Sequence, residues 1–192
     1  MSSWKRQYLS FNEELFSIIA IEDFKAECEL QILDKNAKLT HAGQIYADLF
    51  YLEEGLVYCT NFTDGRTLWF EREHNFFTCA QSFVYETRSN KEITCLEPSR
   101  IYRLPKSQLR TLCKEYLKWA AWWIHLLEHE YVKLQFFQEE FLHKSAADRY
   151  NLLLDMVPDL SARIPLKNIA SFLGISQVSL SRIRAGKQQA FF

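Results

Sequence analysis

The chain has 192 residues, of which 48% are hydrophobic and 15% aromatic, and its formal net charge is −1. This composition excludes a disordered chain and supplies enough apolar side chains for one large domain or two small ones. The charge is unevenly distributed: residues 143–192 contain seven Lys or Arg and three Asp or Glu, so they carry +4 and the remainder −5. A basic C-terminal segment is the distribution that a DNA-binding region requires.

The five cysteines are scattered, odd in number and without a Cys-x-x-Cys spacing; they are Cys28, Cys59, Cys79, Cys95 and Cys113. This pattern disfavours a disulfide framework and a cysteine-rich metal site, and favours reduced thiols. The N-terminus lacks the apolar segment of a signal peptide, and the longest apolar run, residues 119–127, is too short to span a membrane. We therefore expect a cytoplasmic protein without membrane segments.

The N-terminal half begins with helical patterns and continues with strands. Asn12-Glu13-Glu14 predicts the start of a helix that reaches about Ile21, because acidic residues interact favourably with the N-terminal end of the helix dipole. A second helix or a loop is expected at 24–28. Further on, Asp64-Gly65 predicts a tight hairpin turn, and regularly spaced short strands predict a sandwich or β-roll. The predicted strands are residues 30–33, 47–52, 56–62, 67–70, 92–96 and 100–104.

Residues 106–143 contain neither Pro nor Gly and predict one long helix of about 55 Å at the standard rise. Apolar residues at alternating spacings of three and four, interrupted by Gln138, predict a coiled-coil dimer seam. A second stripe is apolar only in the first half of the helix and predicts packing against the β-domain. The alternative is a single long helix buried in a monomer. The seam consists of Leu117, Ala120, Ile124, Leu127, Tyr131, Leu134 and Phe141, and the second stripe of Tyr116, Trp119, Trp123 and Leu126.

Beyond this helix, the pattern predicts a helix-turn-helix. Ser145 and Asp148 occupy capping-box-like positions at the start of a further helix, which Pro158 should end. Two short helical patterns then meet at Gly174, where the turn requires a left-handed backbone, and Ser176 can cap the second one. Apolar residues form the buried stripes, namely Ile169 and Leu173 in the first helix and Leu180 and Ile183 in the second.

The polar side chains off these stripes suit base edges and phosphates of DNA. The alternatives are an ordinary helix pair and a helix-turn-helix that binds only protein. The expected DNA-binding residues are Lys167, Ser176, Gln177, Val178, Ser179, Ser181, Arg182, Arg184 and Lys187.

Nearly the whole chain resembles the Crp–Fnr family of bacterial transcription regulators. The spacing of Gly43, Gly55 and Asp64-Gly65 resembles the β-roll of that family. Asp148-Arg149-Tyr150 and the stretch from Ile164 to Ile175, followed by Leu180-Ser-Arg-Ile-Arg184, resemble its C-terminal domain.

The resemblance implies an α+β fold in three parts. Residues 1–113 would form a cyclic-nucleotide-binding-like sensor domain, a β-roll of double-stranded β-helix or jelly-roll type with flanking helices. Residues 114–143 would form the dimerisation helix, and residues 144–192 a small winged-helix-like helix-turn-helix domain. The implied partners are double-stranded DNA with a two-fold operator, a second copy of the chain, RNA polymerase and a small-molecule effector. Gln177, Val178 and Arg182 match base-contacting positions of the family, whereas Ser176, Ser179, Lys167 and Lys187 are better placed for phosphate.

The expected effector site departs from the family pattern. Members that bind cyclic AMP carry a Gly-Glu pair after a Phe, followed further on by Arg-Ser or Arg-Thr. Here Thr78-Cys79 replaces the Gly-Glu pair, and Arg88-Ser89 matches only with one residue of slippage. We therefore expect an effector other than cyclic AMP. The N-terminus also lacks the cysteine set of members that carry an iron–sulfur cluster. The expected effector pocket consists of Phe77, Thr78, Cys79, Ser82, Arg88, Ser89 and Asn90.

Enzymatic alternatives rest on histidines. His125-Leu-Leu-Glu128-His129 matches the His-x-x-Glu-His pattern of some zinc peptidases, in which two histidines bind the metal beside a glutamate base. We expect both histidines on the outward face of the helix and find no third ligand. A metal-binding roll using His41 and His74 lacks a nearby carboxylate cluster. We therefore expect a transcription factor without catalytic activity, metal or cofactor.

Overall fold

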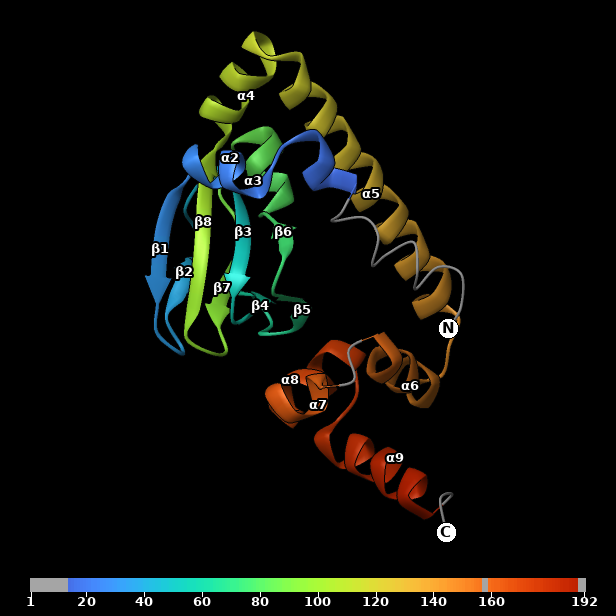
Figure 1. The fold of residues 1–192 in the computed structure, drawn as a ribbon. Coiled ribbons are helices and arrows are strands. Elements are labelled where there is room, and N and C mark those ends of the chain that lie inside the picture. Colours follow the sequence, from blue (N-terminus) through green and yellow to red (C-terminus); the bar gives the residue numbers. More distant parts are fainter. Residues whose placement is uncertain (1–13, 157–158, 190–192) are drawn as a thin grey trace.

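The computed structural model describes residues 14–156 and 159–189. Two β-sheets form a roll, helices cover one end of it, and a long helix leads away from the roll to a helical C-terminal segment (Figure 1). This arrangement confirms the predicted α+β class and the order of its parts. The expected winged-helix character has no counterpart in the described residues beyond 142, which contain helices but no strand.

The roll consists of two four-stranded antiparallel sheets with the strand orders β1-β8-β3-β6 and β2-β7-β4-β5. All six predicted strands are present, with bounds that differ by a few residues. The sequence patterns missed β2 and β6, because three residues are too few to show a periodicity. The strands are β1 Glu29–Leu33, β2 Lys38–Thr40, β3 Asp48–Glu54, β4 Leu56–Asn61, β5 Thr67–Arg72, β6 Asn75–Phe77, β7 Lys91–Cys95 and β8 Ser99–Pro105.

Helices complete the roll at one end. Residues 14–18 are helical, so the first predicted helix ends before Ile21. After a break at residues 19–20, α2, Ile21–Ala26, takes the place of the second helix or loop expected at 24–28. The sequence patterns gave no sign of α3, Ala80–Tyr85. An aromatic cluster joins these helices to the sheet: Trp122 is fully buried, and its ring centroid lies 5.3 Å from those of Phe24 and Phe76. This cluster fixes the start of the long helix on the roll.

The predicted single helix over residues 106–143 is wrong, because the structure has two helices. These are α4, Lys106–Glu115, and α5, Leu117–Leu142, separated by Tyr116 in an extended conformation at φ −129° and ψ 113°. The change of direction lets Leu112 of α4 and Trp119 of α5 enter the same buried cluster, and Figure 1 shows the corner between the two helices. Since neither Pro nor Gly marks the break, packing rather than local sequence produces it.

Four helices form the C-terminal segment: α6 Ala146–Met156, α7 Leu160–Arg163, α8 Leu166–Leu173 and α9 Gln177–Gln189. The predicted cap of α6 is confirmed, since the Asp148 N–H donates to Ser145 Oγ at 3.2 Å. Pro158, the predicted end of that helix, lies outside the described residues. Helix α7 lies between α6 and the predicted helix-turn-helix.

Candidate nucleic-acid interface and effector site

The turn between α8 and α9 has the geometry of a helix-turn-helix. Gly174 adopts φ 68° and ψ 32°, a left-handed conformation that costs a residue with a Cβ more than it costs glycine. The Ile175 N–H donates to Ala170 O at 3.0 Å, which closes the end of α8. Leu173 and Leu180 are fully buried between the two helices, as their spacing predicts.

Helix α9 begins with a side-chain cap and presents a polar face to solvent. The Ser179 N–H donates to Ser176 Oγ at 3.1 Å, which confirms the predicted cap. The side chain of Val178 is 62% exposed, so its methyl groups are accessible to a partner. The exposed residues of this face are Ser176, Gln177, Val178, Ser179, Ser181 and Arg182, and Lys167 of α8 is exposed as well.

The remaining cations of this segment differ in accessibility. Arg182 is exposed and has no ion-pair partner among the described residues, so the salt bridge within the domain that would compete with DNA binding has no support there. Arg184 is half-buried, which makes it a poorer candidate for direct contact. The side chain of Lys187 lies outside the described part of the chain.

The predicted dimer seam is exposed over most of α5. Leu117, Ile124, Leu127, Tyr131 and Leu134 stand on the helix surface with large exposed fractions, from 47% for Leu127 to 85% for Leu117. The helix is therefore not buried within a monomer, and a connected apolar stripe is available to a partner. Ala120 at the edge of the stripe is half-buried.

The predicted seam is wrong at its C-terminal end, at Phe141. Phe141 is buried and stacks on Phe137 with ring centroids 4.2 Å apart, and both rings pack against Phe172 of α8. The seam residues that can face a partner therefore end at Leu134. The second stripe is confirmed for Trp119 and Leu126, which are buried, and for Trp123, which is half-buried. Tyr116 is half exposed instead, and the fully buried Trp122 was missed.

The residues expected to bind an effector lie close together, but little space remains between them. Ser82, Arg88 and Ser89 line a cavity of about 10 Å³, together with Cys79, Asn90 and two neighbours. That volume holds one water molecule at most. Arg88 donates to Gly43 O at 2.6 Å, so its guanidinium is bound to the roll.

Hydrogen bonds within the chain close this site. Ser82 Oγ accepts from the Tyr46 N–H at 2.8 Å and donates to Thr87 O at 2.7 Å. Thr78 Oγ1 donates to Asp48 O at 2.7 Å, and burial raises the pKa of Cys79, which keeps the thiol protonated. Ligand pockets usually measure several hundred Å³. The chain's own polar groups therefore occupy the expected effector site.

Phe77 does not belong to this site. Its ring stacks on Phe50 at 5.3 Å between the two sheets, where it forms part of the core. Phe77 adjoins Thr78 in the sequence, but it is the last residue of β6, and its ring also packs against Trp69 at 5.9 Å.

A larger cavity of about 360 Å³ lies at the start of α4, and the sequence analysis missed it. Its charged lining is paired: Arg103 bonds to Asp48 at 2.9 Å, and Lys106 bonds to Glu86 at 2.9 Å. Lys106 also donates to Val84 O at 2.9 Å. The spacing of Arg103, Lys106 and Arg110 at the junction of strand and helix was the only signal of this feature in the sequence.

The histidines of α5 face inward, so their predicted outward orientation is wrong. Their side chains are 30% exposed for His125 and 14% for His129, and His125 Nε2 lies 3.6 Å from Glu14 Oε2 on the N-terminal helix. His129 Nδ1 lies 3.7 Å from Glu130 Oε1 instead. The two rings thus face different carboxylates, and no group of three potential metal ligands is found within the described ranges.

The two histidines of the roll also have separate surroundings. His74 Nδ1 lies 3.2 Å from the hydroxyl of Tyr51, whereas the backbone N–H of His41 donates to the hydroxyl of Tyr46.

No protein-family model matches the chain, and no curated protein matches it. Solved structures do match. FixK2 from Bradyrhizobium japonicum aligns at a TM-score of 0.67 and 15% identity, over 85% of each chain. The global regulator CLP of Xanthomonas campestris, described as responsive to c-di-GMP, aligns at 0.67 and 17% identity, over 88% of this chain and 91% of that one. A protein from Eubacterium rectale assigned to the crp/fnr family of transcriptional regulators aligns at 0.66 and 16% identity, over 93% and 83%.

These similarities define the fold: a β-roll joined through a long helix to a helical C-terminal segment, an architecture shared with a structure assigned to the crp/fnr family. The predicted resemblance is confirmed at the level of architecture. At most 17% of the aligned residues are identical in these three structures, so the roles of individual side chains must be argued from this chain. Within its described part, no helix is both long and apolar enough to cross a membrane.

Proposed function

We propose that the protein is a sequence-specific DNA-binding transcriptional regulator that acts as a homodimer and has no catalytic activity. The observation that supports this most directly is helix α9, which begins with a capped, solvent-exposed turn bearing amide, hydroxyl and guanidinium groups. A short helix of this kind can enter the major groove with its N-terminal residues on the base edges. The similar structure from Xanthomonas campestris is described as a global regulator that links cell–cell signalling to virulence gene expression, and the one from Eubacterium rectale as a transcriptional regulator.

Three residues of α9 read the bases in this proposal. Arg182 can bind guanine with two hydrogen bonds, Gln177 can do the same with adenine, and each good pair discriminates by about 1–3 kcal/mol. Val178 can only make apolar contact, which favours a thymine methyl. Ser176, Ser179 and Lys167, together with Lys187, bind phosphate and fix the position of the helix without selecting sequence.

Dimerisation uses the exposed stripe of α5 from Leu117 to Leu134. Two such stripes can bury one another at the 3-4 spacing of a coiled coil. The resulting two-fold symmetry places the recognition helices on half-sites one DNA turn, or a multiple of it, apart.

The effector of this regulator is not cyclic AMP. The closed cavity beside Ser82 and the Arg88–Gly43 hydrogen bond support this, because a nucleotide would have to displace several internal hydrogen bonds. Any effector of the roll would therefore bind differently or elsewhere. A contact with RNA polymerase remains part of the proposal through the family resemblance alone.

Selection of DNA fragments from a genomic or random pool tests the function. We expect an enriched two-fold sequence, and Arg182→Ala should lose preference at one base position of each half-site while keeping nonspecific binding. An Arg182→Ala protein with the full sequence preference would contradict the assigned recognition helix. If no fragment is retained at low salt, the helix-turn-helix binds protein instead.

A further inference from the structure

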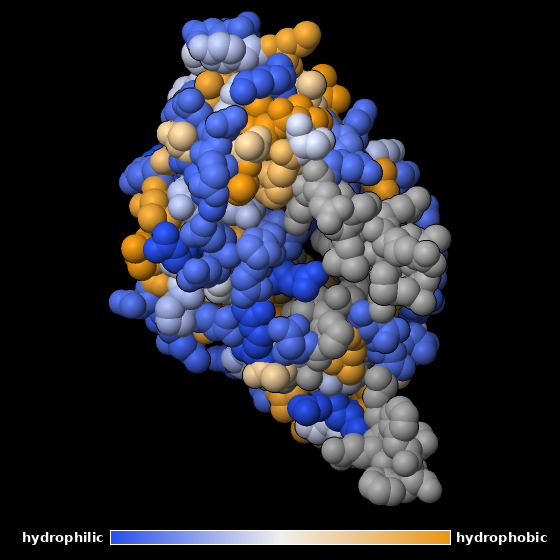
Figure 2. Space-filling view, in the orientation of Figure 1, coloured by the Kyte–Doolittle hydropathy of each residue, from blue (hydrophilic) through white to orange (hydrophobic). Residues whose placement is uncertain are grey.

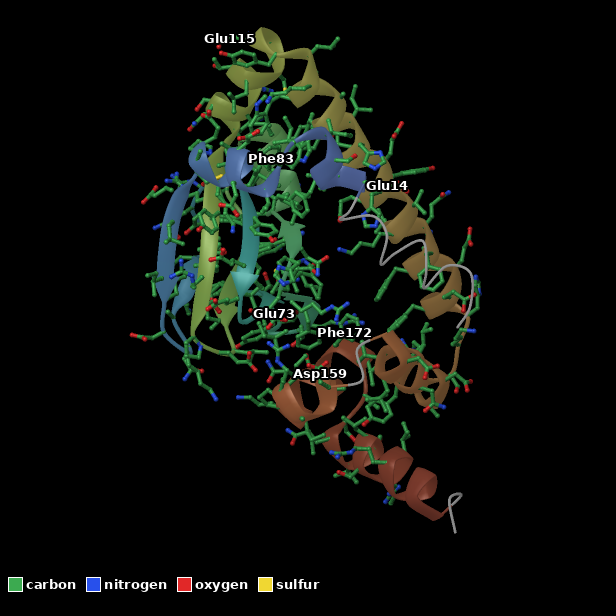
Figure 3. All side chains as sticks on the ribbon, in the orientation of Figure 1. Glu14, Glu73, Phe83, Glu115, Asp159 and Phe172 are labelled. Atoms are coloured by element: carbon green, nitrogen blue, oxygen red, sulfur yellow. The ribbon has the colours of Figure 1, made fainter. Side chains whose placement is uncertain are left out.

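The C-terminal segment docks directly on the roll, at the β4–β5 hairpin. The Thr67 N–H of β5 donates to Ser171 Oγ of α8 at 2.9 Å, and Phe70 packs edge-on against Phe172 at 5.4 Å. Leu56 and Leu96 of the roll share one buried cluster with residues of α6, α8 and α9. Glu73, Asp159 and Phe172 are labelled at this junction in Figure 3, where α7 and α8 lie beneath the hairpin.

One guanidinium joins three carboxylates at the same junction. Arg163 of α7 donates to Glu97 through Nε at 3.0 Å and through a second nitrogen at 2.6 Å. It also makes two hydrogen bonds to Glu73, one of 3.1 Å, and one to Asp159 at 3.4 Å. Its Nη2 also donates to Gly55 O at 3.2 Å, so the two hydrogens of that nitrogen are shared among three acceptors. We call Arg163 and these three carboxylates the Arg163 cluster.

The Arg163 cluster spans the two parts of the chain. Glu73 and Glu97 belong to turns of the roll, whereas Asp159 and Arg163 belong to the C-terminal segment. Burial alone would raise the pKa of Glu73, but the hydrogen bonds from Arg163 hold it below the ordinary value. Glu73 is therefore ionised, and the cluster places three acidic side chains around one guanidinium. Without Arg163, these carboxylates would repel one another across the junction.

The docking leaves the DNA-binding face free. Helices α7 and α8 make the contacts with the roll, while Gln177, Val178 and Arg182 of α9 stay exposed. Figure 1 shows α9 running away from the roll. The contact therefore cannot block DNA by covering the recognition helix, but it can hold that helix in one orientation relative to α5.

We propose that Arg163 is a positioning residue, which locks the helix-turn-helix on the roll, beside the β4–β5 hairpin, in the orientation that binds DNA. This inference rests on the proposed function. An unlocked segment would occupy this orientation only part of the time, and the apparent affinity for an operator would fall by that fraction. A rigidly docked segment moves together with the roll, so a conformational change in the roll changes the orientation of the recognition helix.

Amide hydrogen exchange of the full-length protein tests the docking without DNA. The Thr67 N–H is bonded across the junction to Ser171, so its protection reports on the docked state. Arg163→Gln should speed its exchange about tenfold or more. The matched control is Arg100→Gln, which removes the Arg100–Glu53 pair within the roll and should leave Thr67 protected. Unchanged Thr67 exchange in Arg163→Gln overturns the proposal.

A second substitution separates charge from packing. In the Arg163→Gln background, Glu97→Gln removes one of the repelling carboxylates and should restore part of the Thr67 protection. If the second substitution instead speeds exchange further, the loss of side-chain packing explains the effect and the charge argument fails.

Operator binding tests the positioning role. Arg163→Gln should weaken binding about tenfold with an unchanged salt dependence, because the number of phosphate contacts stays the same. A salt slope of operator binding reduced by about one per subunit would make Arg163 a phosphate ligand. Faster exchange of the Thr67 amide with full operator affinity would show that docking does not position the helix. Either result overturns the proposal. A wild-type protein that retains no DNA would refute the proposed function alone, because exchange measures the docking independently.

Discussion

A charge in the exposed stripe of α5 should dissociate the dimer, and the structure supplies a matched control. Ile124 is 56% exposed at the centre of the stripe, whereas Val132 is 60% exposed on the same helix but off the stripe. Both are β-branched residues of similar accessibility within α5. The substitutions Ile124→Asp and Val132→Asp therefore differ chiefly in whether a partner helix covers the position.

The expected size of the effect follows from burial. Covering a fully exposed Ile contributes about 1.5–3 kcal/mol, so the exposed half of Ile124 accounts for about 1 kcal/mol per subunit and about 2 kcal/mol per dimer. Ile124→Asp loses this contribution and also brings two carboxylates together in an apolar seam, which adds several kcal/mol at most. We expect the dissociation constant to rise at least about 30-fold from the lost burial alone, since 1.4 kcal/mol corresponds to a factor of ten.

Sedimentation equilibrium over a range of protein concentrations measures this constant. Wild type and Val132→Asp should give the same dimer, and Ile124→Asp should sediment as a folded monomer with an unchanged circular dichroism spectrum. An Ile124→Asp protein that remains dimeric at the wild-type concentration would refute the seam. Equal weakening by both substitutions would show that the helix as a whole, and not the stripe, responds to added charge.

Further predictions concern DNA, effector, core and pH. Lys167→Ala should weaken all DNA sequences alike and lower the salt slope by about one per subunit, as measured by fluorescence anisotropy. Calorimetry with cyclic AMP should show no heat of binding; micromolar saturation that Arg88→Ala abolishes would contradict the closed site. Trp122→Ala should lower the free energy of unfolding in urea by about 3–5 kcal/mol, because it empties a fully buried aromatic site. Burial raises the pKa of Cys59 from an ordinary 9.0 to about 12. The thiol therefore loses its proton at a lower pH in the unfolded chain than in the folded one, and the free energy of unfolding should fall as pH rises above 9. Cys59→Ala should reduce this pH dependence in urea unfolding.

Local patterns predicted the elements whose signals are local. Short runs rich in β-branched and aromatic residues between turn signals located β3, β4 and β8, and the combination of Gly174, the Ser176 cap and two apolar stripes located the helix-turn-helix. Elements of three residues such as β2 have no period to detect. The break at Tyr116 was also invisible, because the residue itself is compatible with a helix and only the aromatic cluster around Trp122 favours the turn.

The sequence predicted that a helix is present at α5, but not which of its residues are buried and which are exposed. The 3-4 spacing places Leu117 and Phe141 on one seam, yet the structure exposes the first and buries the second. The difference arises because the far end of α5 packs against α8, and Phe172 takes the place of a partner subunit there. The same limit explains the histidines: a helix pattern shows which residues share a face but not what lies opposite that face.

The junction between the roll and the C-terminal segment shows why the remaining part of the site could not be predicted. Arg163 and Glu73 are 90 residues apart, and Thr67 and Ser171 are 104 apart. No periodicity connects such pairs; they meet because Leu56, Leu96 and Phe172 bury one apolar surface between two otherwise separate parts. Burial of the apolar surface stabilises the contact between the two parts. The Arg163 cluster fixes their relative orientation, because the guanidinium can donate to the carboxylates in only a few orientations. The recognition helix is exposed but held at a fixed angle. A movement of the β4–β5 hairpin can therefore alter DNA binding by reorienting this helix, although the hairpin itself does not contact DNA.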